Sequence, residues 1–167
     1  MERNELNKRL FELARRYADE LKRILGENLV SVILFGSVAR GEADRQSDID
    51  IFIVLEKAPK GMLKRRKLLE PARQNLTKEL EKLWQEDIFT DFVEIIRTKD
   101  EALRFHPVYL DMIENGIVLY DRGEFMSEVL KKVAIQLKKL GAKKVKVGKV
   151  WHWDLKPDYR IGEVIKI

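Results

Sequence analysis

Two short segments, Gly36-Ser37-Val38-Ala39-Arg40-Gly41 and, after five further residues, Ser47-Asp48-Ile49-Asp50, connect two apolar runs. The run before them, residues 29–35, is rich in β-branched side chains and has the length of a strand. The run after them, residues 49–55, has the same character. The sequence therefore predicts a glycine-containing turn between the end of one buried strand and the start of another.

Two aspartates mark the start of the second predicted strand. Because side chains alternate along a strand, Asp48 and Asp50 share one face, with their Cα atoms about 7 Å apart. Two like charges at the edge of an apolar sheet repel each other unless a cation lies between them. The pair therefore indicates a divalent-metal site.

The glycine turn has the features of a phosphate-binding loop. Gly36 allows a sharp turn and a close approach of the backbone to a ligand. Ser37 and the residues after it can open a short helix, whose free N–H groups favour phosphate. Arg40 adds a cation for phosphate oxygens. Beside a metal site, this combination suits a nucleoside triphosphate bound with magnesium.

The same residues resemble the signature of the nucleotidyltransferase superfamily that includes DNA polymerase β, and especially of its small stand-alone members, the minimal nucleotidyltransferases. The resemblance extends without a gap from Gly36 to Asp50. A tight turn followed by a solvated acidic strand start is the alternative, but it explains neither the paired aspartates nor their apolar surroundings. With the resemblance, the expected fold is α/β (α+β), with a small mixed sheet flanked by helices on one side, like the polymerase β palm.

The resemblance also implies a chemistry. It implies a metal-dependent nucleotidyltransferase that transfers a nucleoside monophosphate, with AMP from ATP as the default, to an acceptor hydroxyl and releases pyrophosphate. Two Mg²⁺ ions are expected, the first bound by Asp48 and Asp50 and the second by Asp50 and a third carboxylate. The expected nucleotide-binding residues are Gly36, Ser37, Arg40 and Ser47.

The third carboxylate is expected from a third strand, predicted over residues 88–97. Glu94, which stands among apolar residues, is favoured as this catalytic and metal-binding group. Asp91 is the alternative ligand, and its side chain is expected on the opposite face of the strand. A site with only two acidic ligands is the remaining reading.

A second functional hypothesis concerns a protein partner. Minimal nucleotidyltransferases often pair with a small helical protein, in arrangements that resemble toxin–antitoxin systems. The chain would then act as an antitoxin-like binding partner, with weak or no catalysis.

Patterns elsewhere complete the predicted architecture. A nucleotidyltransferase core is expected over residues 1–122, followed by an appendage, residues 123–167, made of a helix and a basic β-hairpin. Pro71 is expected to start a second helix or to kink the first, and Thr98 to Glu101 form a capping box. The remaining predicted elements are helices over 4–25, 108–115 and 124–140 and strands over 117–120, 143–147, 150–155 and 162–167.

Composition limits the class of protein. The 167 residues are 45% hydrophobic, which supports a core, and 37% charged, with no cysteine for disulfides or Cys-based zinc sites. No apolar run reaches membrane-spanning length, and a cytoplasmic protein is expected. The net charge of +5 permits contact with nucleic acid but does not demand it. Lysines next to tryptophans in the C-terminal segment fit RNA binding, but a soluble edge hairpin protected by lysines is favoured. The basic run over residues 64–67 is expected to be a solvated helix face.

Overall fold

A four-stranded mixed sheet forms the centre of the computed structural model, which describes residues 2–148 and 150–167. The strand order is β3-β2-β1-β4. β1 is antiparallel to β2 and to β4, whereas β2 is parallel to β3. The strands are β1 (Leu29–Phe35), β2 (Ile49–Leu55), β3 (Phe92–Thr98) and β4 (Ile117–Asp121). The predicted α/β fold with a small mixed sheet is therefore confirmed.

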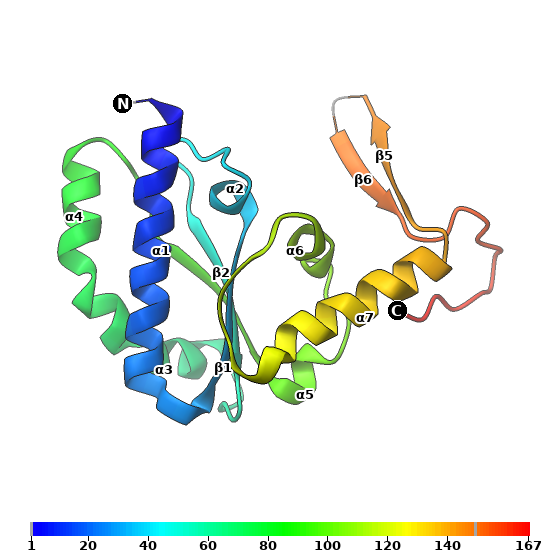
Figure 1. Cartoon of the computed structure of the whole chain (residues 1–167), viewed down its shortest axis with the longest axis horizontal. Coiled ribbons are helices and arrows are strands. Elements are labelled where there is room, and N and C mark those ends of the chain that lie inside the picture. The colour runs from blue at the N-terminus through cyan, green and yellow to red at the C-terminus, as the bar shows by residue number, and fades with distance from the viewer. Residues whose placement is uncertain (1, 149) are drawn as a thin grey trace.

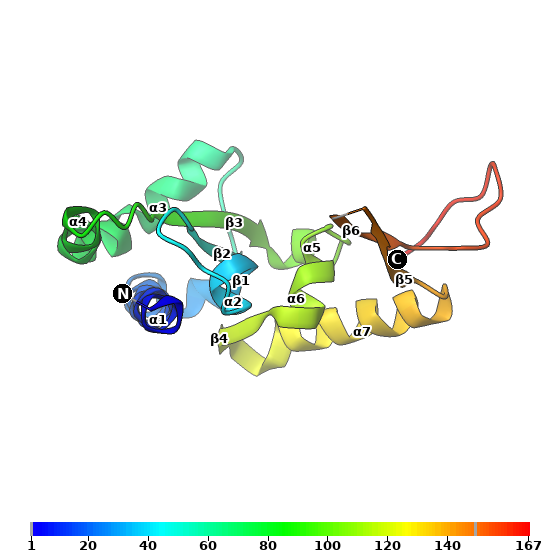
Figure 2. The same cartoon turned by 90° about the horizontal axis from the view of Figure 1, so that it is seen from above.

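Helices cover both faces of this sheet (Figures 1 and 2). The first face packs against α1 (Arg3–Leu25), α3 (Met62–Asn75) and α4 (Thr77–Gln85). The second face packs against α5 (Lys99–Ala102), α6 (Tyr109–Asn115) and α7 (Phe125–Lys139). Short elements fill the connections: α2 (Gly36–Ala39) between β1 and β2, η1 (Gly26–Asn28) and η2 (Arg122–Glu124).

The expectation that helices cover one side of the sheet is wrong. All seven residues of β1 are buried, which requires cover on both faces. On β2, Ile51 and Ile53 belong to the core beneath α1, while Phe52 and Val54 belong to the core beneath α6 and α7. The continuous apolar runs of the two central strands follow from this double burial.

The apolar stripe of α1 explains the first core. Side chains three and four positions apart lie on one face of a helix, and that face packs on the sheet here. The helix ends where Gly26 adopts a φ of +52°, a backbone conformation that favours glycine. The buried residues of α1 are Leu6, Leu10, Leu13, Ala14, Tyr17, Ala18 and Leu21.

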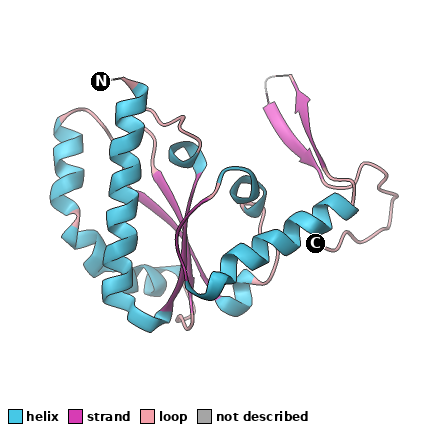
Figure 3. Cartoon of the chain, in the orientation of Figure 1, coloured by secondary structure: helices cyan, strands magenta, loops and turns pink. Residues whose placement is uncertain are grey.

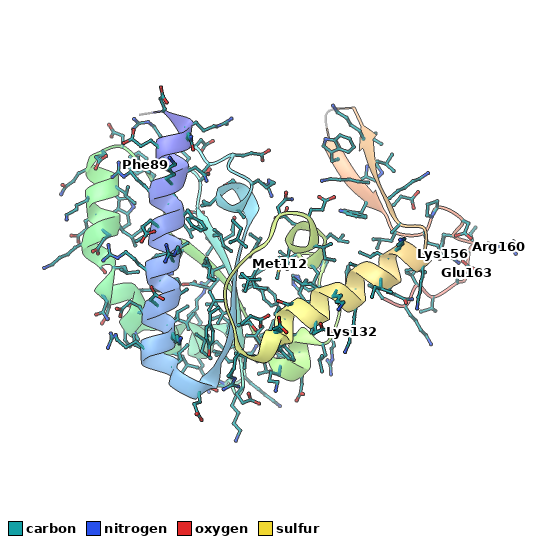
Figure 4. All side chains as sticks on the ribbon, viewed as in Figure 1. Phe89, Met112, Lys132, Lys156, Arg160 and Glu163 are labelled. Atoms are coloured by element: carbon teal, nitrogen blue, oxygen red, sulfur yellow. The ribbon has the colours of Figure 1, made fainter. Side chains whose placement is uncertain are left out.

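Three segments differ from the sequence prediction by more than one residue. β3 begins at Phe92 rather than at residue 88, since Phe89 (Figure 4) is exposed and joins the segment around Arg45 through a single backbone hydrogen bond. α3 continues through Pro71, and the next helix starts at Thr77. Residues 162–167 form no strand: a turn covers residues 161–162, and Glu163 pairs with Lys156 (Figure 4).

The C-terminal segment forms a separate two-stranded sheet, β5 (Lys143–Val147) and β6 (Val150–Asp154), which stands apart from the central sheet (Figure 3). The predicted hairpin is therefore present, although its turn residue Lys149 lies outside the described residues. α7 packs on the second face of the central sheet. The division of the chain after residue 122 stays a prediction. Within residues 2–148 and 150–167, no helix has the length and apolar character needed to cross a membrane.

One residue of the basic run over 64–67 is buried. The Arg65 guanidinium donates to both oxygens of Glu101, at 2.6 and 2.8 Å, and to the carbonyl of Pro59 at 2.8 Å. Glu101 also accepts from the Thr98 N–H and completes the predicted capping box of α5. The prediction of a solvated face is confirmed for Lys64, Arg66 and Lys67 and is wrong for Arg65. This ion pair ties α3 to the end of β3.

The Arg65–Glu101 pair predicts a pH-dependent contribution to stability. The hydrogen bonds from Arg65 lower the pKa of Glu101 to about 2 in the folded protein. A lowered folded pKa stabilises the fold above the ordinary pKa of a glutamate and ceases to do so as the pH falls through the folded value. We expect Glu101→Gln to lower the free energy of unfolding by about 1 kcal/mol near pH 7, because the side chain is partly exposed.

Urea denaturation at several pH values checks this effect. The difference between Glu101→Gln and wild type should shrink as the pH falls from about 4.5 towards about 2. Glu12→Gln serves as the control, because its pair with Arg15 joins two exposed side chains. A difference that stays constant over this range would contradict the assignment.

Candidate nucleotide and metal site

The candidate site begins where β1 ends. Gly36 follows Phe35 with a φ of +72°, and a Cβ atom on it would lie 2.2 Å from Oδ2 of Asp50. No side chain fits in that space, so only glycine lets the backbone meet this carboxylate. The close contact places the turn after β1 directly against the start of β2.

The predicted aspartate pair lies at the start of β2. Asp50 is half-buried opposite Phe35, and Asp48 is exposed just before the strand. Burial raises the pKa of Asp50, and the neighbouring charge of Asp48 raises it further, against the opposing charge of Arg40. The ionised form of Asp50 is therefore disfavoured in the protein without a cation, as the sequence suggested for like charges held together.

Arg40 and Ser47 have protein partners. Arg40 donates to Glu42 and to Asp111, each at 2.9 Å, so its guanidinium lies at the mouth of the turn. The Ser47 hydroxyl donates to Oδ1 of Asp44 and accepts from the Asp44 N–H. Arg40 therefore lies beside Gly36 as expected, whereas Ser47 is engaged in closing the loop before Asp48.

Glu94 does not join Asp48 and Asp50. In the parallel register of β2 and β3, Glu94 pairs with Ile51, whose side chain belongs to the core beneath α1. Its side chain is 2% exposed. It accepts hydrogen bonds from the Tyr17 hydroxyl at 2.9 Å and from Arg73 at 2.6 Å. The expectation that Glu94 faces the aspartates is therefore not met in this structure, because the strand register turns it to the other face of the sheet.

Asp91 lies directly before β3, and its backbone adjoins Asp48. Its backbone N–H donates to Oδ1 of Asp48 at 3.2 Å, and its carbonyl accepts from the Ile49 N–H at 2.9 Å. Its carboxylate accepts two hydrogen bonds from Arg73, both at 2.8 Å. Asp91 is therefore the neighbour of Asp48 across the strands.

Arg73 holds both candidate third carboxylates at once. One guanidinium nitrogen reaches Glu94 and the other reaches Asp91. Burial opposes the charge on Arg73, but the charges of Glu94 and Asp91 outweigh it and raise the pKa of Arg73. Burial and Glu94 likewise raise the pKa of Tyr17. A polar pocket of about 350 Å³ opens beside this group, lined by Arg66, Glu70, Arg73, Asp91, Phe92, Val93 and Glu94.

The sequence analysis missed Tyr17, Arg73 and Asp111. Tyr17 was part of the apolar stripe of the first helix, and the sequence gives no sign that its hydroxyl reaches Glu94. Asp111 lies in the predicted helix over 108–115 and belongs to no recognisable sequence motif. Each contact joins residues far apart in the chain, so only the folded arrangement reveals it.

The donor set of the site fits a divalent cation. Mg²⁺ prefers carboxylate oxygens and retains water, and Asp48 and Asp50 offer such oxygens beside a backbone turn without a side chain. The destabilised charge on Asp50 is what a cation would relieve. In residues 2–148 and 150–167, no three acidic or histidine side chains converge as a complete set of ligands. Substrate phosphates commonly supply further ligands to Mg²⁺.

A mixed sheet that holds a glycine turn against two aspartates is the arrangement expected of a nucleotidyltransferase. The chain matches the family described as nucleotidyltransferase domain over residues 14–167. This protein belongs to that nucleotidyltransferase family, and the resemblance drawn from Gly36 to Asp50 is confirmed.

Two similar proteins come from Methanocaldococcus jannaschii. One, named "Putative protein adenylyltransferase MJ1305", is 26% identical over 125 residues, which are 74% of this chain and 80% of that protein. The other, named "Putative protein adenylyltransferase MJ0141", is 38% identical over 50 residues, 30% of this chain and half of that protein's length.

Solved structures with a similar course of the chain are toxin–antitoxin complexes. A toxin–antitoxin structure with AMP-PNP has a TM-score of 0.45 at 21% identity and covers 76% of this chain and 92% of that one. A tri-AMPylated HEPN toxin of Shewanella oneidensis in complex with the MNT antitoxin has a TM-score of 0.42 at 17% identity and covers 78% and 92%.

The contact between Gly36 and Asp50 predicts a severe effect of one methyl group. In Gly36→Ala, the added Cβ must displace the Asp50 carboxylate, and the positive φ adds strain. We expect the affinity for ATP with Mg²⁺ to fall at least about tenfold, as measured by calorimetry.

Gly41→Ala is the matched control for backbone strain. Gly41 has a φ of +73°, but a Cβ there meets nothing within 4 Å. Its affinity should stay near that of wild type. Equal affinities for Gly36→Ala and wild type would show that phosphates and metal do not bind at this turn.

Proposed function

We propose that this protein transfers AMP from ATP to a hydroxyl group of an acceptor protein and releases pyrophosphate. The observation that carries the proposal is the Asp48–Asp50 pair, held against the side-chain-free turn at Gly36, in a member of the nucleotidyltransferase family. A protein acceptor is supported by the name of MJ1305, which matches this chain over most of both lengths.

Each part of the site has a task in this reaction. The Gly36 N–H and the Arg40 guanidinium, which donate to the Asp111 carboxylate in this structure, are the groups that we assign to phosphate oxygens of ATP. Asp48 and Asp50 are the residues that would hold Mg²⁺. The bound Mg²⁺ would neutralise charge on the triphosphate and lower the pKa of the acceptor hydroxyl. The half-burial of Asp50 would strengthen its electrostatic interaction with a bound cation.

We propose Asp91, rather than Glu94, as the third carboxylate. Asp91 adjoins Asp48 through a backbone hydrogen bond, and about half of its side chain is exposed. Oδ1 of Asp91 accepts from both Arg73 and the Phe92 N–H, whereas Oδ2 accepts from Arg73 alone and can accept a further bond. Glu94, by contrast, is buried on the first face of the sheet, where it accepts a hydrogen bond from Arg73. Arg73 then positions Asp91, and Glu94 positions Arg73.

Transfer of label from α-labelled ATP tests the proposed function. The protein is incubated with Mg²⁺, each α-labelled nucleoside triphosphate in turn, and a lysate of the source organism. A protein band labelled from ATP, absent with Asp50→Asn, supports the proposal. Label in an RNA or a small molecule would overturn the protein acceptor. The antitoxin-like hypothesis stays a prediction, and a partner that co-purifies without any nucleotide turnover would favour it.

The two candidate third carboxylates make opposite predictions. Asp91→Asn should abolish most transfer while leaving stability nearly unchanged, because the lost Arg73 contact is partly exposed. Glu94→Gln should lower the free energy of unfolding by about 3 kcal/mol, because it removes one partner of a buried ion pair.

Single-turnover transfer and urea denaturation of both variants provide the measurement. Turnover is compared at a temperature where each variant is fully folded. If Glu94→Gln is stable and inactive while Asp91→Asn remains active, the assignment of the third carboxylate is wrong.

Asp50 links activity to stability. Because its pKa is raised by burial and by Asp48, its charge destabilises the metal-free protein at neutral pH. Asp50→Asn should abolish transfer and yet raise the melting temperature without metal by a few degrees, on the scale of about 1 kcal/mol.

Thermal melts with and without ATP and Mg²⁺ decide this point. Ligands stabilise the state that they bind, so the wild type should gain much more from ATP and Mg²⁺ than the variant. A destabilised Asp50→Asn that gains as much as wild type would indicate a structural aspartate.

A further inference from the structure

The carboxylate of Asp111 accepts hydrogen bonds from two of the donors assigned to the phosphates of the nucleotide. Oδ2 of Asp111 accepts the Gly36 N–H at 2.9 Å, and Oδ1 accepts from Nη1 of Arg40 at 2.9 Å. Both donors lie in the turn between β1 and β2, whereas Asp111 comes from α6, more than 70 residues later in the chain. The turn therefore already holds an anion, and this anion belongs to the protein.

The position of Asp111 is fixed by the packing of α6. Tyr109 and Met112, which flank it on the helix, are buried in the core beneath the second face of the sheet. Figure 4 labels Met112 on α6. The Tyr109 ring meets Phe52 edge to face, and its hydroxyl donates to the carbonyl of Ala102. These contacts hold the start of α6 beside the turn, so that the carboxylate reaches Gly36 and Arg40 without disturbing the core.

The charge of Asp111 acts on the same site. It adds to the burial and to the Asp48 charge that raise the pKa of Asp50. A triphosphate is also negative, so Asp111 repels it while holding the donors that it needs. A carboxylate and a phosphate oxygen accept the same kind of hydrogen bond from guanidinium and backbone N–H groups. The carboxylate and the phosphate therefore compete for the Gly36 N–H and the Arg40 guanidinium.

A purely local role of Asp111 accounts poorly for these contacts. An acid in the first turn of a helix commonly accepts from the free N–H groups of its own helix. Within α6, Asp111 accepts only from the Asn115 side chain, at 3.2 Å, among the described residues. Its two shortest bonds go to the turn before β2.

We propose that Asp111 is an internal competitor of the nucleotide, whose carboxylate must leave the Gly36 N–H and Arg40 before the triphosphate binds them. The proposal rests on the proposed function, because it assigns these donors to phosphate. Asp111 then lowers the affinity for every anion at this turn.

Binding of tripolyphosphate and of ATP to purified variants tests this proposal. Calorimetry is performed with tripolyphosphate in the presence of a chelator and with ATP in the presence of Mg²⁺. Asp111→Asn should bind both ligands about fivefold more tightly than wild type, since the partly exposed ion pair with Arg40 is lost. Asp111→Ala, which also frees the Gly36 N–H, should bind at least as tightly.

Two further variants separate this effect from a general change in charge. Glu114→Gln removes the same charge from the same helix, but Glu114 pairs with Lys144 of the hairpin and should leave both affinities unchanged. Introducing Arg40→Gln into Asp111→Asn should remove most of the gain, because the freed guanidinium is what binds the phosphate. Thermal melts establish that each variant is folded.

The outcomes are distinct. Tighter binding in Asp111→Asn and not in Glu114→Gln supports the proposal. Unchanged binding, or an equal gain in Glu114→Gln, overturns it and leaves the proposed function standing. Tighter binding of tripolyphosphate with weaker binding of ATP and Mg²⁺ overturns it in favour of Asp111 as a metal ligand. Failure of wild type and variant alike to bind any triphosphate overturns both this inference and the proposed function.

Discussion

The site depends on the absence of one side chain. At Gly36 the backbone comes so close to the Asp50 carboxylate that a methyl group would lie 2.2 Å from its oxygen. This contact brings a row of backbone donors and a pair of carboxylates into one place, which is what a triphosphate with its cation requires. It also explains the order of the sequence: an apolar strand delivers the turn, and a second apolar strand delivers the acids. Both strands must be buried, since a solvated edge could not hold the turn against the carboxylate.

The face of the sheet on which a side chain lies decides its role more than its type does. Along β2, Ile51 turns to α1 while Asp50 and Phe52 turn to α6, because successive side chains alternate. The parallel pairing with β3 puts Glu94 on the face of Ile51, whereas Asp91 lies just before that strand. Glu94 thereby becomes a buried partner of Arg73, and Asp91 becomes a neighbour of Asp48. The two acids, three residues apart, therefore share Arg73 as a partner but differ in burial, since only Asp91 is partly exposed.

This division explains what the sequence could and could not predict. Residues 29–35 and 49–55 were predicted as strands with the bounds that the structure has, because burial on both faces leaves an unbroken apolar run. The turn and the aspartate pair were also predicted, because their spacing along the chain is itself the signal. The choice between Glu94 and Asp91 depends on the register with β2, which a single strand does not encode. The Asp111 contact depends on where α6 packs, and it spans 75 residues from Gly36.

The Arg73 cluster shows how the fold keeps charge near the site without losing stability. Burying an unpaired carboxylate destabilises a fold by roughly several kcal/mol. Hydrogen bonds from Tyr17 and Arg73 offset this cost for Glu94. Arg73 in turn carries its charge to the surface at Asp91, beside Asp48. The network therefore connects Tyr17 of α1 and Arg73 of α3 with Asp91, which adjoins Asp48. On the first face, Tyr17, Glu94 and Arg73 are bonded to one another and hold Asp91. On the second face, the Asp111 carboxylate is the group that the nucleotide would displace from Gly36 and Arg40.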